Sequence, residues 1–208
     1  PKGLSQLHKD ERKVMMFPGL GKEAELWAEL GFDEENMFFI EEDLYIGDEV
    51  KKKFPKANMF TMNLEKNLIP FNRFIGDNQF SVVNLDPESQ MTLNFSKAIG
   101  QFKKKRRATG LIAYNFYALR ERRVVQDFYR SVNGHIANYH SVDKKGVDPD
   151  DLDAQRESAV KNLLNYSWCD GQCGGAKRAI DWSKKSHSGS YEASGGGKMV
   201  YSMHQILR

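Results

Sequence analysis

Two glycines stand where an apolar stretch of the sequence gives way to a helix-forming one. The apolar run Val14–Phe17 ends at Pro18, Gly19-Leu-Gly21 follows, and Lys22–Leu30 then carries apolar residues at helical spacing. Because glycine has no Cβ, the backbone of such a turn can approach a ligand closely, and the first N–H groups of the following helix attract an anion. This stretch therefore predicts a loop that holds a cofactor or a phosphate group.

A pair of acidic residues has the spacing that a nucleotide cofactor would need. Glu41 and Glu42 follow a second apolar run, Met37–Ile40, about 20 residues beyond the glycines. A carboxylate at the end of a strand accepts hydrogen bonds from ribose hydroxyls. The glycine loop, with Ala24 as its last small residue, also fits the dinucleotide pattern, which would make the protein an NAD(P)-dependent oxidoreductase.

The elements that must position these residues alternate between strand and helix. The pattern predicts strands at Val14–Phe17, Met37–Ile40, Asn58–Met62, Phe80–Leu85 and Ala108–Phe116, and helices at Lys22–Leu30, Tyr45–Phe54 and Gln90–Lys105. Such apolar strands indicate a doubly wound α/β fold, a mostly parallel sheet with helices on both faces. The segments Ser186–Ala193 and Lys198–Leu207 predict a C-terminal antiparallel hairpin. Ligands of doubly wound sheets bind beyond the carboxyl ends of the strands.

The glycine loop resembles that of class I S-adenosylmethionine (SAM)-dependent methyltransferases. In that family the loop wraps the amino-acid end of the cofactor, and an acidic residue usually stands two positions before the first glycine. Phe17 occupies that position here. The resemblance implies that an acid after the second strand holds the ribose and that the loop after the third strand contacts the adenine. The cofactor-binding residues that it implies are Phe17, Pro18, Gly19, Leu20, Gly21, Glu41, Glu42, Asn63 and Leu64.

The end of the fourth predicted strand carries a second motif of this kind. Asn84-Leu-Asp-Pro-Glu88 resembles the Asp/Asn-Pro-Pro-Tyr and Asp-Pro-Phe-Gly signatures of methyltransferases that modify nitrogens, many of them on nucleic acid bases. In those enzymes the polar side chain and a backbone carbonyl accept hydrogen bonds from the target amino group. The resemblance implies catalytic roles for Asn84, Asp86 and Pro87. A turn or a helix cap is the structural alternative for Asp86 and Pro87.

Aromatic and basic residues near that motif favour a nucleic-acid substrate. Phe116 and Tyr117 end the fifth strand, where a ring would stack on a planar substrate, and Arg120 follows them. The dense basic run Lys103–Arg107 and the smaller run Lys51–Lys53 each fit either contact with phosphate or the solvated end of a helix. The alternative for the aromatic and basic residues is core packing beside a solvated basic helix.

The totals of the sequence limit the class of protein. Its 208 residues suit one domain with a substantial core, and 40% hydrophobic with 28% charged residues is a globular balance. No apolar run approaches the roughly 20 residues that a membrane helix needs. We expect a single Rossmann-like domain over 1–208, in which 121–185 is a substrate-recognition region or an insert.

Cysteine content and the sum of the motifs complete the expectation. Two cysteines cannot build a disulfide framework, so we expect a reducing, cytoplasmic setting. Cys169 and Cys173 lack further ligands at zinc-site spacing, so we expect no metal. The sequence predicts a SAM-dependent methyltransferase that acts on a nitrogen, or another nucleophile, of nucleic acid. An NAD(P)-dependent oxidoreductase and a catalytically silent Rossmann-like binding module are the alternatives.

Overall fold

Strands and helices alternate along the chain, as the sequence pattern predicts. The computed structural model describes residues 12–86, 92, 95, 98, 108–117, 155, 186–192 and 198–205. The elements are β1 (Val14–Met16), α1 (Lys22–Glu29), the 3-10 turn η3 (Glu34–Asn36), β2 (Met37–Ile40), α2 (Leu44–Lys53), β3 (Asn58–Phe60), α3 (Leu68–Ile75), β4 (Phe80–Leu85), β5 (Ala108–Tyr117), β6 (Ser186–Glu192) and β7 (Lys198–Gln205). Most of the helix expected at Gln90–Lys105 lies outside the described residues, within which Phe95 and Ala98 are helical.

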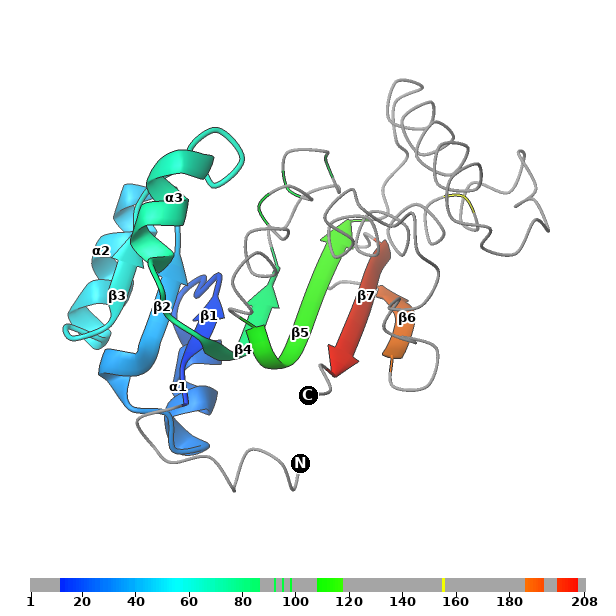
Figure 1. Cartoon of the computed structure of the whole chain (residues 1–208), viewed down its shortest axis with the longest axis horizontal. Helices are drawn as coiled ribbons and strands as arrows, with labels where there is room; N and C mark the ends of the chain where they lie inside the picture. The colour runs from blue at the N-terminus through cyan, green and yellow to red at the C-terminus, as the bar shows by residue number, and fades with distance from the viewer. Residues whose placement is uncertain are drawn as a thin grey trace.

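Five of the strands form a parallel sheet, which confirms the α/β fold class. Their order is β3-β2-β1-β4-β5, with β1 and β4 at the centre (Figure 1). Met15 of β1 lies between Phe38 of β2 and Val83 of β4. The sheet continues beyond β5 with β7, which pairs antiparallel with both β5 and β6. The segment 193–197 that joins β6 to β7 lies outside the described residues, so the hairpin connection stays a prediction.

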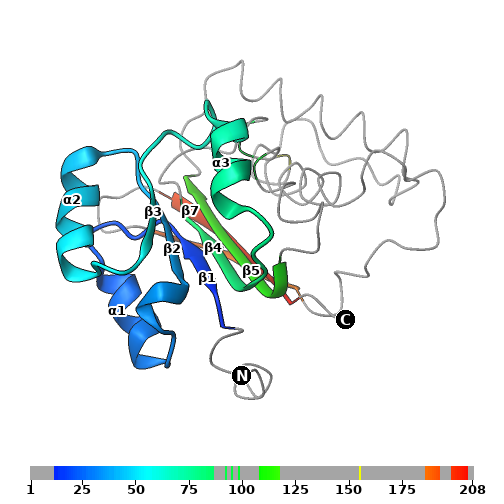
Figure 2. The same cartoon turned by 60° about the vertical axis from the view of Figure 1, so that its left-hand side comes forward.

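Helices cover both faces of the parallel sheet, and each face has its own apolar cluster. Ala24 of α1 and Val50 of α2 pack with one cluster, whereas Phe71 and Ile75 of α3 pack with the other. Figure 2 shows α1 and α2 on one side of the sheet and α3 on the other. In β1, β2 and β4 alternate residues serve the two clusters, so these strands are buried on both faces. No helix among the described residues has the length and apolar character to cross a membrane.

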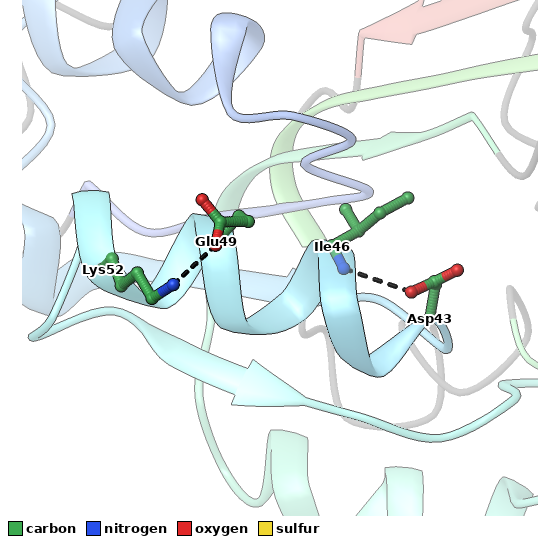
Figure 3. A network of polar contacts seen from close by, with 4 residues as sticks. All are labelled: Asp43, Ile46, Glu49 and Lys52. Atoms are coloured by element: carbon green, nitrogen blue, oxygen red, sulfur yellow. Dashed lines mark hydrogen bonds and ion pairs between the residues drawn. The ribbon is translucent and has the colours of Figure 1, made fainter.

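The start of α2 follows from a capping residue in the sequence. One carboxylate oxygen of Asp43 accepts hydrogen bonds from the backbone N–H groups of Tyr45 at 2.9 Å and Ile46 at 3.1 Å. These bonds satisfy two of the N–H groups that a helix start leaves without partners. Farther along α2, Lys52 and Glu49 form an exposed ion pair at 2.6 Å (Figure 3). Asp43 therefore fixes the start of α2, so the loop between β2 and α2 is short. This loop lies at the carboxyl edge of the sheet.

The sequence pattern assigned no helix to the segment between the third and fourth strands, where the structure has α3 with Pro70 in its first turn. Proline in a helix interior removes a hydrogen bond. Here Pro70 is the third residue of the helix, where the N–H group has no intrahelical partner, so its ring removes no bond. Phe71 and Ile75, one turn apart, are fully buried against the sheet. Burial of this apolar stripe stabilises the helix.

A close approach of two backbones positions β5 beside β4. A Cβ added to Gly110 would lie only 2.3 Å from the backbone oxygen of Ser81. The pairing of β4 with β5 shifts register at the same place, between Phe80 and Val82. Glycine therefore allows the two strands to run together, which sets Tyr114 opposite Leu85 near the carboxyl end of β4.

Candidate functional site

The glycine loop joins β1 to α1 at the carboxyl edge of the sheet. Gly19 and Gly21 have φ angles of +48° and +89°, a backbone region that favours glycine. The N–H group of Gly21 donates to the carbonyl of Pro18 at 2.8 Å and closes a tight turn. A Cβ on Gly19 would meet no described atom within 4 Å, so this part of the loop borders open space. That geometry suits a ligand that contacts the backbone directly.

The other side of the loop is held by the end of α2. The Nζ atom of Lys53 donates to the carbonyl of Leu20 at 3.1 Å and pairs with Glu25 of α1 at 3.2 Å. A Cβ on Gly21 would lie 3.3 Å from the ring of Phe54, closer than an ordinary contact. Gly21 is therefore needed for packing within the protein, whereas Gly19 faces open space. Lys53, the last residue of the basic run Lys51–Lys53, therefore holds the glycine loop against α2.

Three acids after β2 have three different environments. Glu41 is half-buried, and its carboxylate accepts the N–H group of Asp43 at 2.9 Å. Burial raises the pKa of Glu41 above its ordinary value, and the hydrogen bond from Asp43 offsets part of that rise. Glu42 is exposed and accepts a hydrogen bond from Nδ2 of Asn63 at 2.6 Å. Asp43 caps α2. Among these three acids, Glu41 is the one whose charged form is disfavoured by burial. A hydrogen bond from a ligand hydroxyl would stabilise that charged form.

Two neighbouring residues of the loop after β3, Asn63 and Leu64, have different surroundings. Asn63 accepts the N–H group of Lys66 at 3.0 Å and donates to Glu42, which links the loops after β2 and β3. Leu64 is buried, with only 4% of its surface exposed, in the apolar cluster below α3. Asn63 thus lies at the carboxyl edge of the sheet, while the side chain of Leu64 packs in the core.

The carboxyl end of β4 is tied to α1 by a polar contact. The Nδ2 atom of Asn84 donates to Oε1 of Glu23 at 2.5 Å, and the indole N–H of Trp27 donates to the same oxygen at 3.0 Å. Glu23 is in the first turn of α1, directly after the glycine loop. Asn84 pairs in register with Met16, the last residue of β1. The contact therefore places the Glu23 carboxylate beside the carboxyl ends of β1 and β4.

The remaining predicted residues near β4 and β5 are described only in part. Oδ2 of Asp86 accepts a hydrogen bond from Nδ2 of Asn115 on β5 at 3.1 Å. The backbone of Phe116 and Tyr117 continues β5. The side chains of these two residues, Pro87, Arg120 and the basic run Lys103–Arg107 lie outside the described part of the chain. The structure therefore brings Asn84 and Asp86 to the edge of the sheet that carries the glycine loop.

Phe17 is half-buried against the protein core. It packs against the apolar cluster on the α3 face, and its ring stacks on that of Phe95 with centroids 6.3 Å apart. Along β1 the side chains alternate between the two faces, and Phe17 follows Met15 on this one. The position that is usually acidic in class I methyltransferases is thus a half-buried apolar position here.

Large apolar side chains are exposed after three of the strands, at the same edge of the sheet. Leu20 follows β1, Leu44 and Tyr45 follow β2, and Met62 follows β3, with 47–73% of their surfaces exposed. Single exposed apolar residues are common, but these four lie on segments that follow three neighbouring strands, with Leu44 and Tyr45 in the first turn of α2. A ligand or partner with a planar apolar face would suit this rim.

Sequence reasoning missed Glu23, Trp27 and the link from Asn84 to α1. An acid in the first turn of the helix after a glycine loop is a usable signal, but many such acids only favour the helix dipole. Within the described ranges no three His, Cys, Asp or Glu side chains are grouped to hold a metal ion. Cys169 and Cys173 lie outside those ranges.

Comparison with known proteins shows a likeness of fold. No family model and no curated protein matches the sequence. Among solved structures, the CurJ carbon methyltransferase has a TM-score of 0.52 at 12% identity, over 100% of this chain and 52% of that one. The chain thus spans about half the length of that structure.

Two further structures are O-methyltransferases with lower scores. The Bacillus cereus enzyme in complex with SAH has a TM-score of 0.47 and 11% identity, over 95% of this chain and 76% of that one. TomG of Streptomyces achromogenes, in complex with SAM, has a TM-score of 0.48 and 10% identity, over 96% and 76%. At such low identities the comparisons concern the fold and leave the substrate undecided.

Proposed function

We propose that this chain is a SAM-dependent methyltransferase. The observation that carries the proposal is the order of the strands. From β1 the chain moves outward to β2 and β3, then returns to β4 and β5 on the other side, so the order reverses between β1 and β4. Ligands of doubly wound sheets bind at such a switch point. Here the glycine loop stands on one side of it and Asn84 and Asp86 on the other.

The residues of the carboxyl edge fit the parts of the cofactor. The loop Phe17–Gly21 borders the amino-acid end, where Gly19 leaves open space for close backbone contact. Glu41 accepts hydrogen bonds from the ribose hydroxyls, which offsets the cost of its burial. Glu42 and Asn63 hold the adenine side, and Leu64 contributes its backbone because its side chain is in the core.

The acceptor side supports transfer to a nitrogen. SAM supplies a methyl group on a positively charged sulfur, and an in-line attack by a lone pair breaks the carbon–sulfur bond and leaves a neutral thioether. Asn84, Asp86 and Pro87 hold the acceptor amino group through its N–H bonds, so that its lone pair faces the methyl carbon. The proton is lost from the nitrogen after transfer. The protein therefore contributes mainly alignment.

A nucleic acid is the acceptor that the sequence favours. Phe116 and Tyr117 stack on a base, Arg120 contacts its backbone, and 121–185 is a recognition region within the one domain. The hairpin of β6 and β7 completes the sheet beside β5. These assignments rest on sequence pattern and are tested by the acceptor assay below.

Cofactor binding tests the proposal first. Calorimetric titration of the purified protein with S-adenosylhomocysteine should show one site, and titration with NADH should show none. NADH binding would favour an oxidoreductase instead. Binding of neither would favour a silent module and would contradict the proposal.

Transfer of tritiated methyl from SAM tests the acceptor. RNA, DNA and a protein extract are offered separately, and we expect label in nucleic acid. Asp86→Ala should abolish this transfer while S-adenosylhomocysteine affinity stays within about twofold, because Asp86 contacts the acceptor rather than the cofactor. Full activity of the variant would refute the acceptor-site assignment.

A further inference from the structure

Glu23 presents a negative charge beside the glycine loop that no described cation neutralises. Its Oε1 atom accepts from two neutral donors, the amide of Asn84 and the indole of Trp27. None of the ion pairs among the described residues includes Glu23, whereas its neighbour Glu25 pairs with Lys53. The Oε2 atom has no described hydrogen-bond partner. One oxygen is thus fixed, and the other can accept a further donor.

The two donors orient this carboxylate toward the switch point. Trp27 lies one turn along α1 and holds Oε1 from the helix side, and Asn84 holds the same atom from β4. Because Asn84 is level with the end of β1, the carboxylate lies at the height at which the glycine loop begins. A half-buried carboxylate with two neutral partners favours a cationic third partner.

The cation that fits this position is a primary ammonium group on the ligand. The amino-acid end of an S-adenosyl ligand carries one, and Phe17, whose ring stacks on Phe95, has no acceptor group to receive it. We propose that the Glu23 carboxylate receives the ammonium group of the bound cofactor and selects ligands that carry an amino-acid end. This inference rests on the proposed function, and it assigns to α1 a role that the sequence motif would give to β1.

Two ligands separate this role from a structural one. S-adenosylhomocysteine carries the ammonium group, and 5′-methylthioadenosine has the same nucleoside without the amino-acid end. Glu23→Gln keeps an oxygen that accepts from Asn84 and Trp27 but removes the charge. We expect its S-adenosylhomocysteine Kd to rise at least about tenfold and its methylthioadenosine Kd to stay within about twofold.

Glu29→Gln provides the matched control, because Glu29 is an exposed acid at the far end of the same helix. It should bind both ligands as the wild type does. Equal losses for both ligands in Glu23→Gln, or no loss for either, would overturn the inference while leaving the proposed function in place. Failure of the wild type to bind S-adenosylhomocysteine would instead overturn the proposed function itself.

Discussion

Comparing Gly19→Ala with Gly76→Ala separates the effect of backbone strain on stability from the effect of an added methyl group on ligand affinity. Gly19 has a φ of +48°, and Gly76, which ends α3, has a φ of +51°. Neither added methyl group clashes: at Gly19 it meets no described atom within 4 Å, and at Gly76 its nearest neighbour is the carbonyl of Arg73 at 3.7 Å. A positive φ of this kind costs a residue with a Cβ about 1–3 kcal/mol, and Gly76, with a ψ of −131°, lies outside the left-handed helical region. Each variant should therefore lose about that much free energy of unfolding.

Only the Gly19 variant should lose ligand affinity. Its methyl group would fill the open space beside the loop, whereas Gly76 precedes β4 at the opposite edge of the sheet. We expect Gly19→Ala to raise the Kd of S-adenosylhomocysteine at least about tenfold, equivalent to about 1.4 kcal/mol, and Gly76→Ala to leave it within about twofold.

Calorimetric titration and urea unfolding of the three proteins measure these quantities. Wild-type affinity in Gly19→Ala would refute the idea that a ligand occupies this space. Equal losses in both variants would show that affinity follows stability rather than contact with the loop.

Three further results should follow from the structure. Gly110→Ala should lower the free energy of unfolding by about 1–3 kcal/mol in urea titrations, because its Cβ would lie 2.3 Å from the oxygen of Ser81 and the strands must separate; unchanged stability would contradict this packing. Because burial raises the folded-state pKa of Glu41, its ionisation destabilises the fold as pH rises from the ordinary glutamate value through that raised pKa. Glu41→Gln should therefore have a higher Tm than the wild type near neutral pH, and this difference in Tm should narrow toward pH 4. The variant should nevertheless bind S-adenosylhomocysteine more weakly. A difference in Tm that does not depend on pH would refute burial of the charge as the cause. Phe17→Asp, which supplies the family's usual acid, should lower stability by about 2–4 kcal/mol without improving affinity, because it removes the ring that stacks on Phe95; tighter binding would show that position 17 belongs to the ligand site.

Strands that are buried on both faces could be predicted from the sequence, because their continuous apolar runs are visible without knowledge of the neighbouring elements. The run Met37–Ile40 is buried on both faces, so its continuous apolar character marked β2 without reference to its neighbours. The helix α3 was not predicted, and its Pro70 is tolerated only because the helix starts at Leu68 and places the proline in the first turn.

The chain's sequence by itself determined that a glycine loop follows β1 and that an acid follows β2, because both are consecutive in the chain. Only the tertiary structure decided which carboxylate stands beside that loop. Glu23 and Asn84 are 61 residues apart, and their contact depends on how α1 packs on β4. The direction of the Phe17 side chain likewise depends on a residue that is distant in sequence. The ring of Phe95 packs against it just beyond the end of β1. Contacts between elements are set by packing, which no single stretch of sequence encodes.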